Sequence, residues 1–420
     1  MTKRDFIKQL ITLGLSASSV NALAEVFESI QKTSVDESST NDAFWQDIRG
    51  HYLLKDDYIN LENGYYSIMP QTILTEYQRL TQEMNLQGSW YMRKQFAQEQ
   101  IETRKMLAEF AGCGSDELVI TRNTTESLDI VIGGQHWVSG DEAIMAHQDY
   151  GAMLNMFKLM EKRYGIVNRL IHVPNHPISD EEIVKLYEDQ ITSKTKLIMV
   201  CHMINITGHV LPVRKICDMA HQHGVKVMVD GAHSFAHLAG KIPDLHCDYY
   251  GTSLHKWLSA PLGNGLLYVK KEHIAGLWPM MAEDPLPEDD IRKLNHMGTI
   301  PPHTMQGIKV ALTFHNMIGS ERKEARLRYL TTYWTTQVRG VKGIQLNTSS
   351  DINRYCGIAN VGIDSMTPSE LANKLLTDYR IWTVAIDRPG VKGCRITPNV
   401  YTSTAELDEL VKALMIINDR

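Results

Sequence analysis

Hydrophobic and polar positions between residues 118 and 270 follow a repeating order that predicts strands and helices in turn. The apolar runs are short and nearly continuous, as in parallel strands that are buried on both faces. The segments between these runs carry the spacing and end signals of helices. The expected strands are 118–121, 143–147, 166–173, 195–202 and 225–229, and the expected helices between them are 151–164, 179–192 and 213–223. This alternation predicts an α/β fold with a mainly parallel, doubly wound sheet.

The pattern changes at about residue 305, where long helices are followed by strand, helix, strand and helix. Thr367-Pro368 is typical of a helix start, with Pro at the first helical position, and Ser403 is a capping residue for the last helix. We therefore expect a large domain over 44–304, which includes an N-terminal segment, and a smaller α+β domain over 305–420.

The first 24 residues do not resemble part of a domain. A basic start precedes an apolar run of small residues, and Ala22-Leu23-Ala24 fits a signal-peptide cleavage site. The segment around Lys3-Arg4 resembles a twin-arginine (Tat-like) export motif with Lys in place of the first Arg. We expect residues 1–24 to be an export signal, 25–43 a linker and the mature protein periplasmic. The alternative is an amphipathic N-terminal helix on a cytoplasmic protein.

Composition excludes several functional classes. The chain of 420 residues is 43% hydrophobic, which is enough for a sizeable core, and its formal net charge is −6. It has no long basic run that would favour nucleic-acid binding, and its body has no apolar stretch long enough to span a membrane. Its six cysteines are scattered and lack metal-binding spacing, so we expect buried free thiols and no metal site.

The chemistry centres on residues 225–256. Asp230 directly follows a buried apolar run, so its carboxylate lies at the carboxyl end of a strand, where open α/β sheets bind ligands. His233 follows on the turn that leaves this strand. Lys256 is flanked by Leu254 and Trp257, and partial desolvation would favour its neutral, nucleophilic amine. An acid and a lysine at neighbouring strand ends are the pair that pyridoxal phosphate requires.

The sequences Asp-Gly-Ala-His at 230–233 and Ser-Leu-His-Lys at 253–256 resemble the class V aminotransferase family, which are fold-type I enzymes that use pyridoxal 5'-phosphate. The resemblance implies that Lys256 forms the Schiff base and that Asp230 keeps the pyridine nitrogen protonated. His233 would tune the phenolic oxygen or the Schiff base. Ser253 and His255 would lie beside the cofactor phosphate.

The same resemblance assigns further cofactor contacts. Thr124 and Thr125 begin a helix, where backbone N–H groups and the helix dipole favour a phosphate, although a plain helix cap also explains them. Tyr150 matches the ring that stacks on the pyridine, and the alternative is a tyrosine at the edge of the core. Asn205 matches the residue that binds the phenolic oxygen, or forms only a turn. Thr299 matches a threonine that reaches the phosphate of a neighbouring subunit, which implies a homodimer with shared sites. The alternative is that Thr299 is an ordinary loop residue.

Arg395 matches the family arginine that binds the substrate α-carboxylate, a role suited to a planar guanidinium, and a surface ion pair is the alternative. Gly64 and Tyr65 belong to a loop that approaches the substrate in the family, or form a surface turn. The expected partner is therefore an amino acid or a peptide-like small molecule.

The resemblance covers about residues 58–418 and implies an external aldimine and an α-carbanion, from which several reactions diverge. His-Gln-Asp-Tyr-Gly at 147–151 is similar to the isopenicillin N epimerase-like branch, which favours an aminotransferase- or epimerase-like enzyme. A carbon–sulfur lyase or a cysteine desulfurase-like enzyme is the alternative, but Cys394 lies beside Arg395 in an expected strand and is poorly placed for attack. A non-catalytic ligand-binding protein on the same fold is the third possibility.

Overall fold

A seven-stranded sheet forms the centre of the computed structural model, which describes residues 2–12, 14–31, 33–281 and 286–419. The strand order is β2-β8-β7-β6-β5-β3-β4, and β8 alone in this sheet runs antiparallel to its neighbours. The strands are β2 (Leu118–Thr121), β3 (Glu142–Ala146), β4 (Val167–Ile171), β5 (Thr195–Cys201), β6 (Lys226–Asp230), β7 (Tyr249–Ser253) and β8 (Gly265–Val269). The expected mainly parallel α/β sheet is confirmed.

Helices cover both faces of this sheet, which explains its continuous apolar runs. Alternate residues of β5 enter different cores: Leu197 and Met199 face one core, and Ile198 and Val200 face the other. The first core is completed by α8 (Thr124–Gly134) and α9 (Gly151–Tyr164). The second is covered by α7 (Phe96–Ala111), α10 (Asp180–Glu188), α11 (Val213–Gln222) and α12 (Pro302–Ile318).

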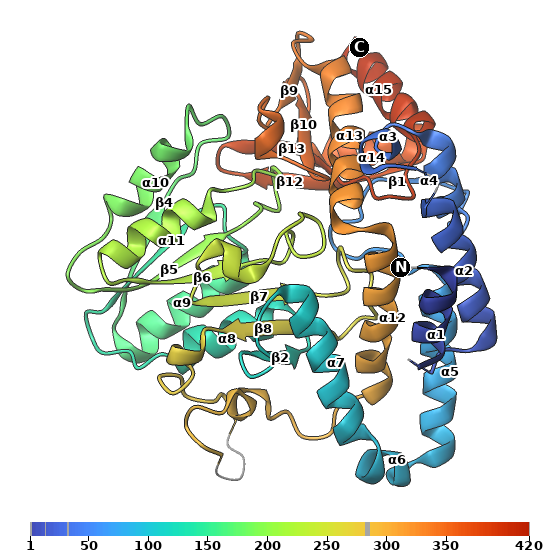
Figure 1. The fold of residues 1–420 in the computed structure, drawn as a ribbon. Coiled ribbons are helices and arrows are strands. Elements are labelled where there is room, and N and C mark those ends of the chain that lie inside the picture. Colours follow the sequence, from blue (N-terminus) through green and yellow to red (C-terminus); the bar gives the residue numbers. More distant parts are fainter. Residues whose placement is uncertain (1, 13, 32, 282–285, 420) are drawn as a thin grey trace.

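A smaller antiparallel sheet lies at the upper end of Figure 1, in the order β12-β13-β10-β9. Its own core lies between the sheet and the helices of this part of the chain. These elements are β9 (Ile344–Leu346), β10 (Ala359–Ile363), β12 (Val384–Arg388), β13 (Val391–Ile396), α13 (Ser320–Val338), α14 (Pro368–Tyr379) and α15 (Thr404–Asn418). Thr367 and Ser403 cap α14 and α15 as the sequence predicts. The short strands β1 (Ile59–Asn60) and β11 (Ile381–Trp382) pair in parallel and attach the N-terminal segment to this unit.

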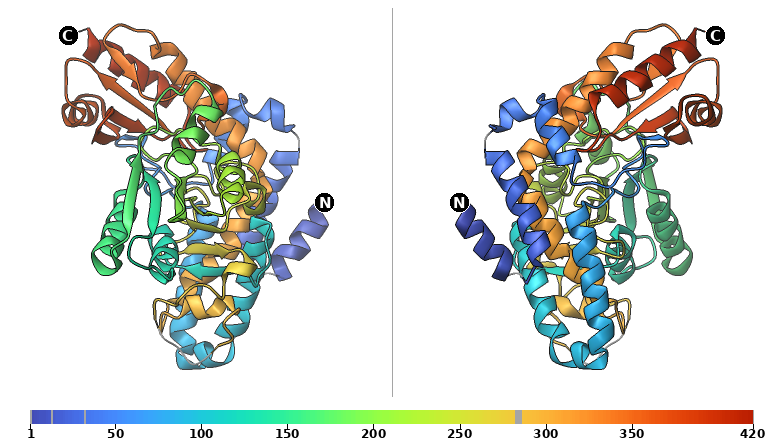
Figure 2. Two further views of the ribbon diagram at one scale, coloured as in Figure 1. Left: turned by 90° about the vertical axis from the view of Figure 1, so that its left-hand side faces the viewer. Right: turned by 90° about the vertical axis from the view of Figure 1, so that its right-hand side faces the viewer.

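The N-terminal segment forms helices that cover one side of the molecule, and Figure 2 shows α1 at its outside. The segment 25–43, expected as a linker, is largely helical and contributes Val26, Phe27 and Ile30 to the core. These apolar side chains recur at helical spacing, which explains why the segment packs rather than extends. The helices of this part of the chain are α1 (Lys3–Thr12), α2 (Ala17–Gln31), α3 (Val35–Ser38), α4 (Asp42–Arg49), α5 (Gln71–Gln87) and α6 (Ser89–Lys94).

Gly231 allows the strand end that carries Asp230 to pass close to β7. A Cβ atom at position 231 would lie 1.9 Å from Cζ of Tyr250, whose buried hydroxyl lies 3.0 Å from that of Ser234. We expect Gly231→Ala to lower the free energy of unfolding by about 3 kcal/mol, because the fixed ring must move. Chemical denaturation measures this change. Gly151→Ala is the control, since a Cβ there meets no atom within 4 Å, and equal losses in both variants would contradict the argument.

Candidate active site

A cavity of about 310 Å³ lies at the carboxyl ends of β5, β6 and β7, where parallel strands of an open sheet place ligand-binding residues. Residues 64–65 of the loop after β1 and Arg395 of β13, in the smaller unit, also line this cavity. The sequence-predicted residues that line it are Gly64, Tyr65, Thr124, Thr125, Tyr150, Asn205, Asp230, His233, Ser253, His255, Lys256 and Arg395. The topology therefore brings together candidates that are separated by more than 300 positions in the chain.

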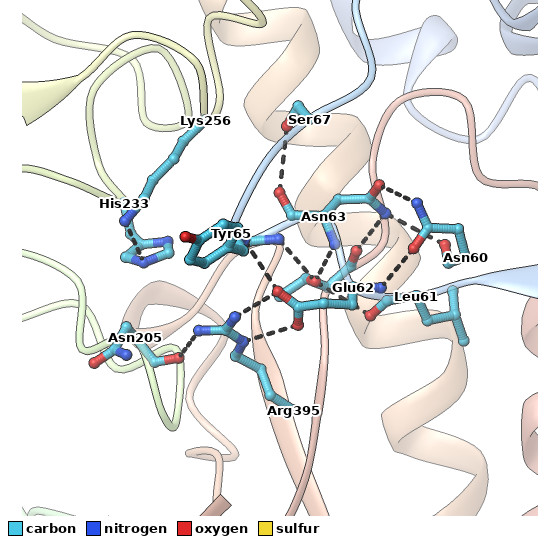
Figure 3. A network of polar contacts seen from close by, with 12 residues as sticks. Asn60, Leu61, Glu62, Asn63, Tyr65, Ser67, Asn205, His233, Lys256 and Arg395 are labelled. Carbon is cyan, nitrogen blue, oxygen red and sulfur yellow. Dashed lines mark hydrogen bonds and ion pairs between the residues drawn. The ribbon is translucent and has the colours of Figure 1, made fainter. Parts of the chain in front are cut away.

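Lys256 and His233 are in direct contact inside this cavity. Lys256 Nζ lies 3.1 Å from His233 Nε2, and Trp257 Nε1 donates to His233 Nδ1 at 3.4 Å (Figure 3 shows the first pair). Burial lowers the pKa of the His233 imidazole well below its usual value, so the ring is neutral. Because the indole N–H can only donate, Nδ1 is the acceptor and the proton lies on Nε2. In this tautomer His233 Nε2 can donate a hydrogen bond to the Lys256 amine when that amine is neutral.

The environment of Lys256 also favours that neutral amine. Burial lowers its pKa to about 8, while the nearby Asp230 carboxylate acts in the opposite direction. A lysine with this pKa is a much better nucleophile near neutral pH than an exposed one. The sequence argument from Leu254 and Trp257 is supported, since both flanking side chains are buried.

Asp230 lies at the end of β6 and is buried. Its Oδ1 accepts the N–H of Ala232 at 2.9 Å, and burial raises the pKa of its carboxyl. A second acid, Asp149, is also buried, and its Oδ2 accepts the N–H of Ala146 at 2.7 Å. Burial and the neighbouring Asp230 raise the pKa of Asp149 to about 8. A protonated ring nitrogen placed beside Asp230 would offset the cost of its buried charge, so this end of the site fits a pyridinium.

A second group of residues that line the cavity has the features of a phosphate site. Thr124 begins α8, where its backbone N–H donates to Ser253 Oγ at 2.8 Å, and the two hydroxyls lie 2.7 Å apart. The helix cap is Asn123 rather than a threonine, so neither threonine hydroxyl serves as the helix cap. His255 Nδ1 is buried with no partner among the described residues, and burial lowers the pKa of this ring to about 4. An orphaned polar atom and a helix N-terminus fit a bound phosphate.

Arg395 lies at the end of β13 and binds an acid that the sequence reasoning missed. Its Nε and Nη2 donate to Glu62 at 3.0 and 2.5 Å, and its Nη1 donates to the carbonyl of Asn205 at 3.2 Å (Figure 3). Glu62 stands two positions before Gly64, so the only sequence signal was its membership of the same loop. Residues Arg122, Asn123, Cys201, Ala232, Leu262 and Gly263 also line the cavity and were not singled out.

Thr299 does not line the cavity. It is exposed, on the stretch between the 3-10 helix at Ile291–Asn295 and α12. Its expected contact is with the phosphate of a neighbouring subunit, which one chain cannot display. The homodimer and the role of Thr299 therefore stay predictions.

All six cysteines are free thiols, and Cys201 is the one that lines this cavity within the described residues. Its Sγ donates to the carbonyl of Met203 at 3.0 Å, and burial raises the pKa of its thiol well above the usual value. Cys394 is fully buried on β13 beside Arg395. Neither thiol is suited to nucleophilic attack.

Among the described residues, no group of His, Cys, Asp and Glu side chains forms a metal site. No helix within the described residues is long and apolar enough to cross a membrane.

Comparisons of sequence place the chain in a known family. Residues 60–392 match the family model described as aminotransferase class-V. Isopenicillin N epimerase from Amycolatopsis lactamdurans is 26% identical over 330 residues, which are 74% of this chain and 83% of that protein. A probable cysteine desulfurase from Methanothermobacter thermautotrophicus is 25% identical over 343 residues, which are 79% of this chain and 84% of that protein.

Solved structures share the fold. The apo cysteine desulfurase from Thermococcus onnurineus NA1 has a TM-score of 0.79 and 20% identity, with coverage of 89% of this chain and 98% of that one. The cystine C–S lyase C-DES, in complex with its product cysteine persulfide, has a TM-score of 0.78 and 22% identity, with coverage of 85% and 97%. The expected fold-type I architecture is confirmed.

Proposed function

The chain belongs to the class V aminotransferase family, and from this premise we propose that it moves the α-proton of an amino acid in an epimerase- or aminotransferase-type reaction. Pyridoxal 5'-phosphate is its cofactor. When bound, the cofactor supplies an electron sink for the bond that breaks at the substrate α-carbon. The observation that carries the proposal is the Lys256 amine, whose pKa is lowered to about 8 and which is buried in one cavity with Asp230 and Arg395.

Each residue then has a defined task. Lys256 Nζ would hold the cofactor through its aldehyde, and the same amine would accept the substrate α-proton. Asp230 would hold a proton on the pyridine nitrogen, and the α8 N-terminus with Ser253 and His255 would hold the phosphate. Arg395 orients the substrate carboxylate. His233 donates to Nζ, which keeps the lysine amine aligned in the cavity.

The hairpin before Arg395 argues against a cysteine desulfurase. Strands β12 and β13 pair up to Arg388 and Val391, so only Pro389 and Gly390 connect them. This tight turn carries no cysteine and leaves no mobile loop that could bring a thiol to the substrate. A carbon–sulfur lyase that needs no protein thiol is the competing function, and product analysis separates it from the proposal.

The proposal is tested by exchange of the α-proton. The purified holoenzyme is incubated with a panel of L- and D-amino acids in D₂O, and proton NMR follows the α-signal while chiral and keto-acid assays identify the product. We expect the α-proton to exchange for deuterium, with the opposite enantiomer or a keto acid as product. Release of sulfide and pyruvate from cysteine would assign the protein to the lyases instead. Absence of exchange with every compound would contradict the proposal.

The pKa of Lys256 predicts how cofactor capture depends on pH. The neutral amine attacks the aldehyde, and its fraction rises as pH approaches the pKa of about 8 from below. We expect the rate of capture by cofactor-free protein to rise about tenfold per pH unit below pH 8 and to level off above it. Stopped-flow absorbance measures this rate. A rise that continues to the usual lysine pKa would show that burial does not tune this amine.

Export and dimerisation are also proposed, on the Tat-like segment at Lys3-Arg4 and on Thr299. The N-terminal helices pack against the rest of the chain, and cleavage during export would break this packing. Ser16 donates its backbone N–H at 2.9 Å to Glu76, whose side chain is fully buried. Cleavage after Ala24 would remove this partner. The intact mass and cell fraction of the native protein test export, and retention of residues 1–24 in the cytoplasm would contradict it.

The shared site is tested with the variant Thr299→Ala. Sedimentation measures its oligomeric state, and a titration measures its affinity for the cofactor.

A further inference from the structure

The guanidinium of Arg395 is already bound on two sides before any substrate arrives. Glu62 occupies its Nε and Nη2 donors, and the carbonyl of Asn205 accepts from Nη1. The side chains of Arg395 and Glu62 are only 8% and 4% exposed, so this is a buried ion pair. The pair therefore carries no net charge into the cavity.

Glu62 is held in a rigid loop rather than reaching in from the surface. Its Oε1 also accepts the backbone N–H of Tyr65 at 3.0 Å. A Cβ atom at Gly64 would lie 3.3 Å from Cζ of Arg395, so the loop backbone passes close to the guanidinium. The carboxylate of Glu62 thus has three N–H partners and a defined position.

Glu62 and a substrate do not compete for the same edge of Arg395. Arg395 lines the cavity, whereas Glu62 is not among the lining residues. Figure 3 shows Glu62 on the side of the guanidinium away from Asn205 and His233. A guanidinium has five N–H donors in one plane. Glu62 and the Asn205 carbonyl accept from three of them, which leaves one N–H on Nη1 and one on Nη2 for a further acceptor. The substrate meets hydrogen-bond donors whose charge is largely balanced.

We propose that Glu62 determines substrate selectivity by balancing the charge of Arg395, so that the site accepts α-amino acids together with their uncharged α-carboxamides. This inference rests on the proposed function, because it assumes that Arg395 receives the carboxyl end of the substrate. An unpaired buried arginine prefers a carboxylate strongly, because a carboxylate carries a negative charge and offers two acceptor oxygens, whereas a carboxamide is uncharged and offers one. A paired arginine keeps the directional donors but loses much of this preference for charge.

Glu62 acts on Lys256 as well, which provides a second and independent readout. Arg395 lowers the pKa of the Lys256 amine, whereas Glu62 raises it. Loss of the negative charge leaves the arginine unopposed, so the pKa of Lys256 falls further. This effect is measured in cofactor-free protein and needs no substrate.

The test is Glu62→Gln, because glutamine keeps the shape and one acceptor but removes the charge. The holoenzyme is titrated with an α-amino acid and its α-carboxamide by absorbance, and Lys256 is titrated in cofactor-free protein by pH-dependent labelling of its amine. We expect the preference for the carboxylate to rise about tenfold or more, and the pKa of Lys256 to fall. An unchanged or smaller preference in folded protein would overturn the inference.

Two further variants separate charge from position. Glu62→Asp keeps the charge but shortens the side chain, and we expect its carboxylate preference to stay close to that of the parent. Glu409→Gln makes the same chemical change at an exposed site, 3.9 Å from Lys412, and should alter neither readout. A rise in preference equal in Glu62→Asp and Glu62→Gln would assign the effect to loop position and overturn the inference. If the parent enzyme binds neither compound, the proposed function fails, while the pKa of Lys256 still decides whether Glu62 balances the charge.

Discussion

Lys256→Ala is expected to abolish exchange of the substrate α-proton, with a loss of about 10³-fold or more. The variant removes both the amine that anchors the cofactor and the base that accepts the proton, and each of these contributes a large factor. Deuterium incorporation followed by NMR measures the loss. Borohydride reduction and peptide mapping should find the cofactor on Lys256 in the parent protein and on no peptide of the variant.

Lys323 provides an internal control for this experiment. It is buried, burial lowers its pKa to about 7, and its Nζ donates to the carbonyl of Trp257. The lowered pKa favours its neutral amine as well, but Lys323 does not line the cavity. The cofactor label should be absent from the Lys323 peptide. A label on Lys323 in place of Lys256 would refute the assignment of the active site.

Asp230→Asn is expected to separate cofactor binding from chemistry. Asparagine keeps an acceptor for the Ala232 N–H but carries no negative charge to hold a proton on the pyridine nitrogen. We expect trapping of the cofactor on Lys256 to persist, while α-proton exchange falls by about 10²–10⁴-fold, the usual range for a catalytic proton. The visible absorbance of the bound cofactor and the exchange rate report the two effects.

Asp149→Asn is the matched comparison, since Asp149 is a buried neighbour that does not line the cavity. Its pKa of about 8 means that it is mostly protonated at neutral pH, and the amide resembles that form. Exchange should stay within about tenfold of the parent rate. Equal losses in the two aspartate variants would show that no single carboxylate holds the ring proton.

Most of the residues that the sequence predicted correctly as cavity-lining lie at or shortly after the end of a strand of the large sheet, whereas Gly64, Tyr65 and Arg395 come from the loop after β1 and from β13. Asn205, Asp230 and Lys256 come shortly after β5, β6 and β7, and parallel strands end at the same edge. The buried strands themselves are short, nearly continuous apolar runs that the hydrophobic pattern identifies. Fold and site could therefore be derived together over this part of the chain.

The pairing of Glu62 with Arg395 could not be derived in this way. Strand β1 has two residues and shows no readable alternation, and its partner β11 lies more than 300 positions later. Contacts of that separation leave no local pattern. An N-terminal helix was only the alternative prediction, because small apolar residues before Ala24 serve equally in a signal and in an amphipathic helix.

The strand pair β1–β11 has a mechanical consequence. The backbone N–H of Thr397 donates to the carbonyl of Leu61, and Asn63 binds Thr397 through both its N–H and its side chain. The loop with Glu62 and the strand with Arg395 are thus parts of one stiff unit, whereas Lys256 belongs to the large sheet. Any hinge rotation between the two bodies would carry Glu62 and Arg395 together toward or away from the Lys256 amine.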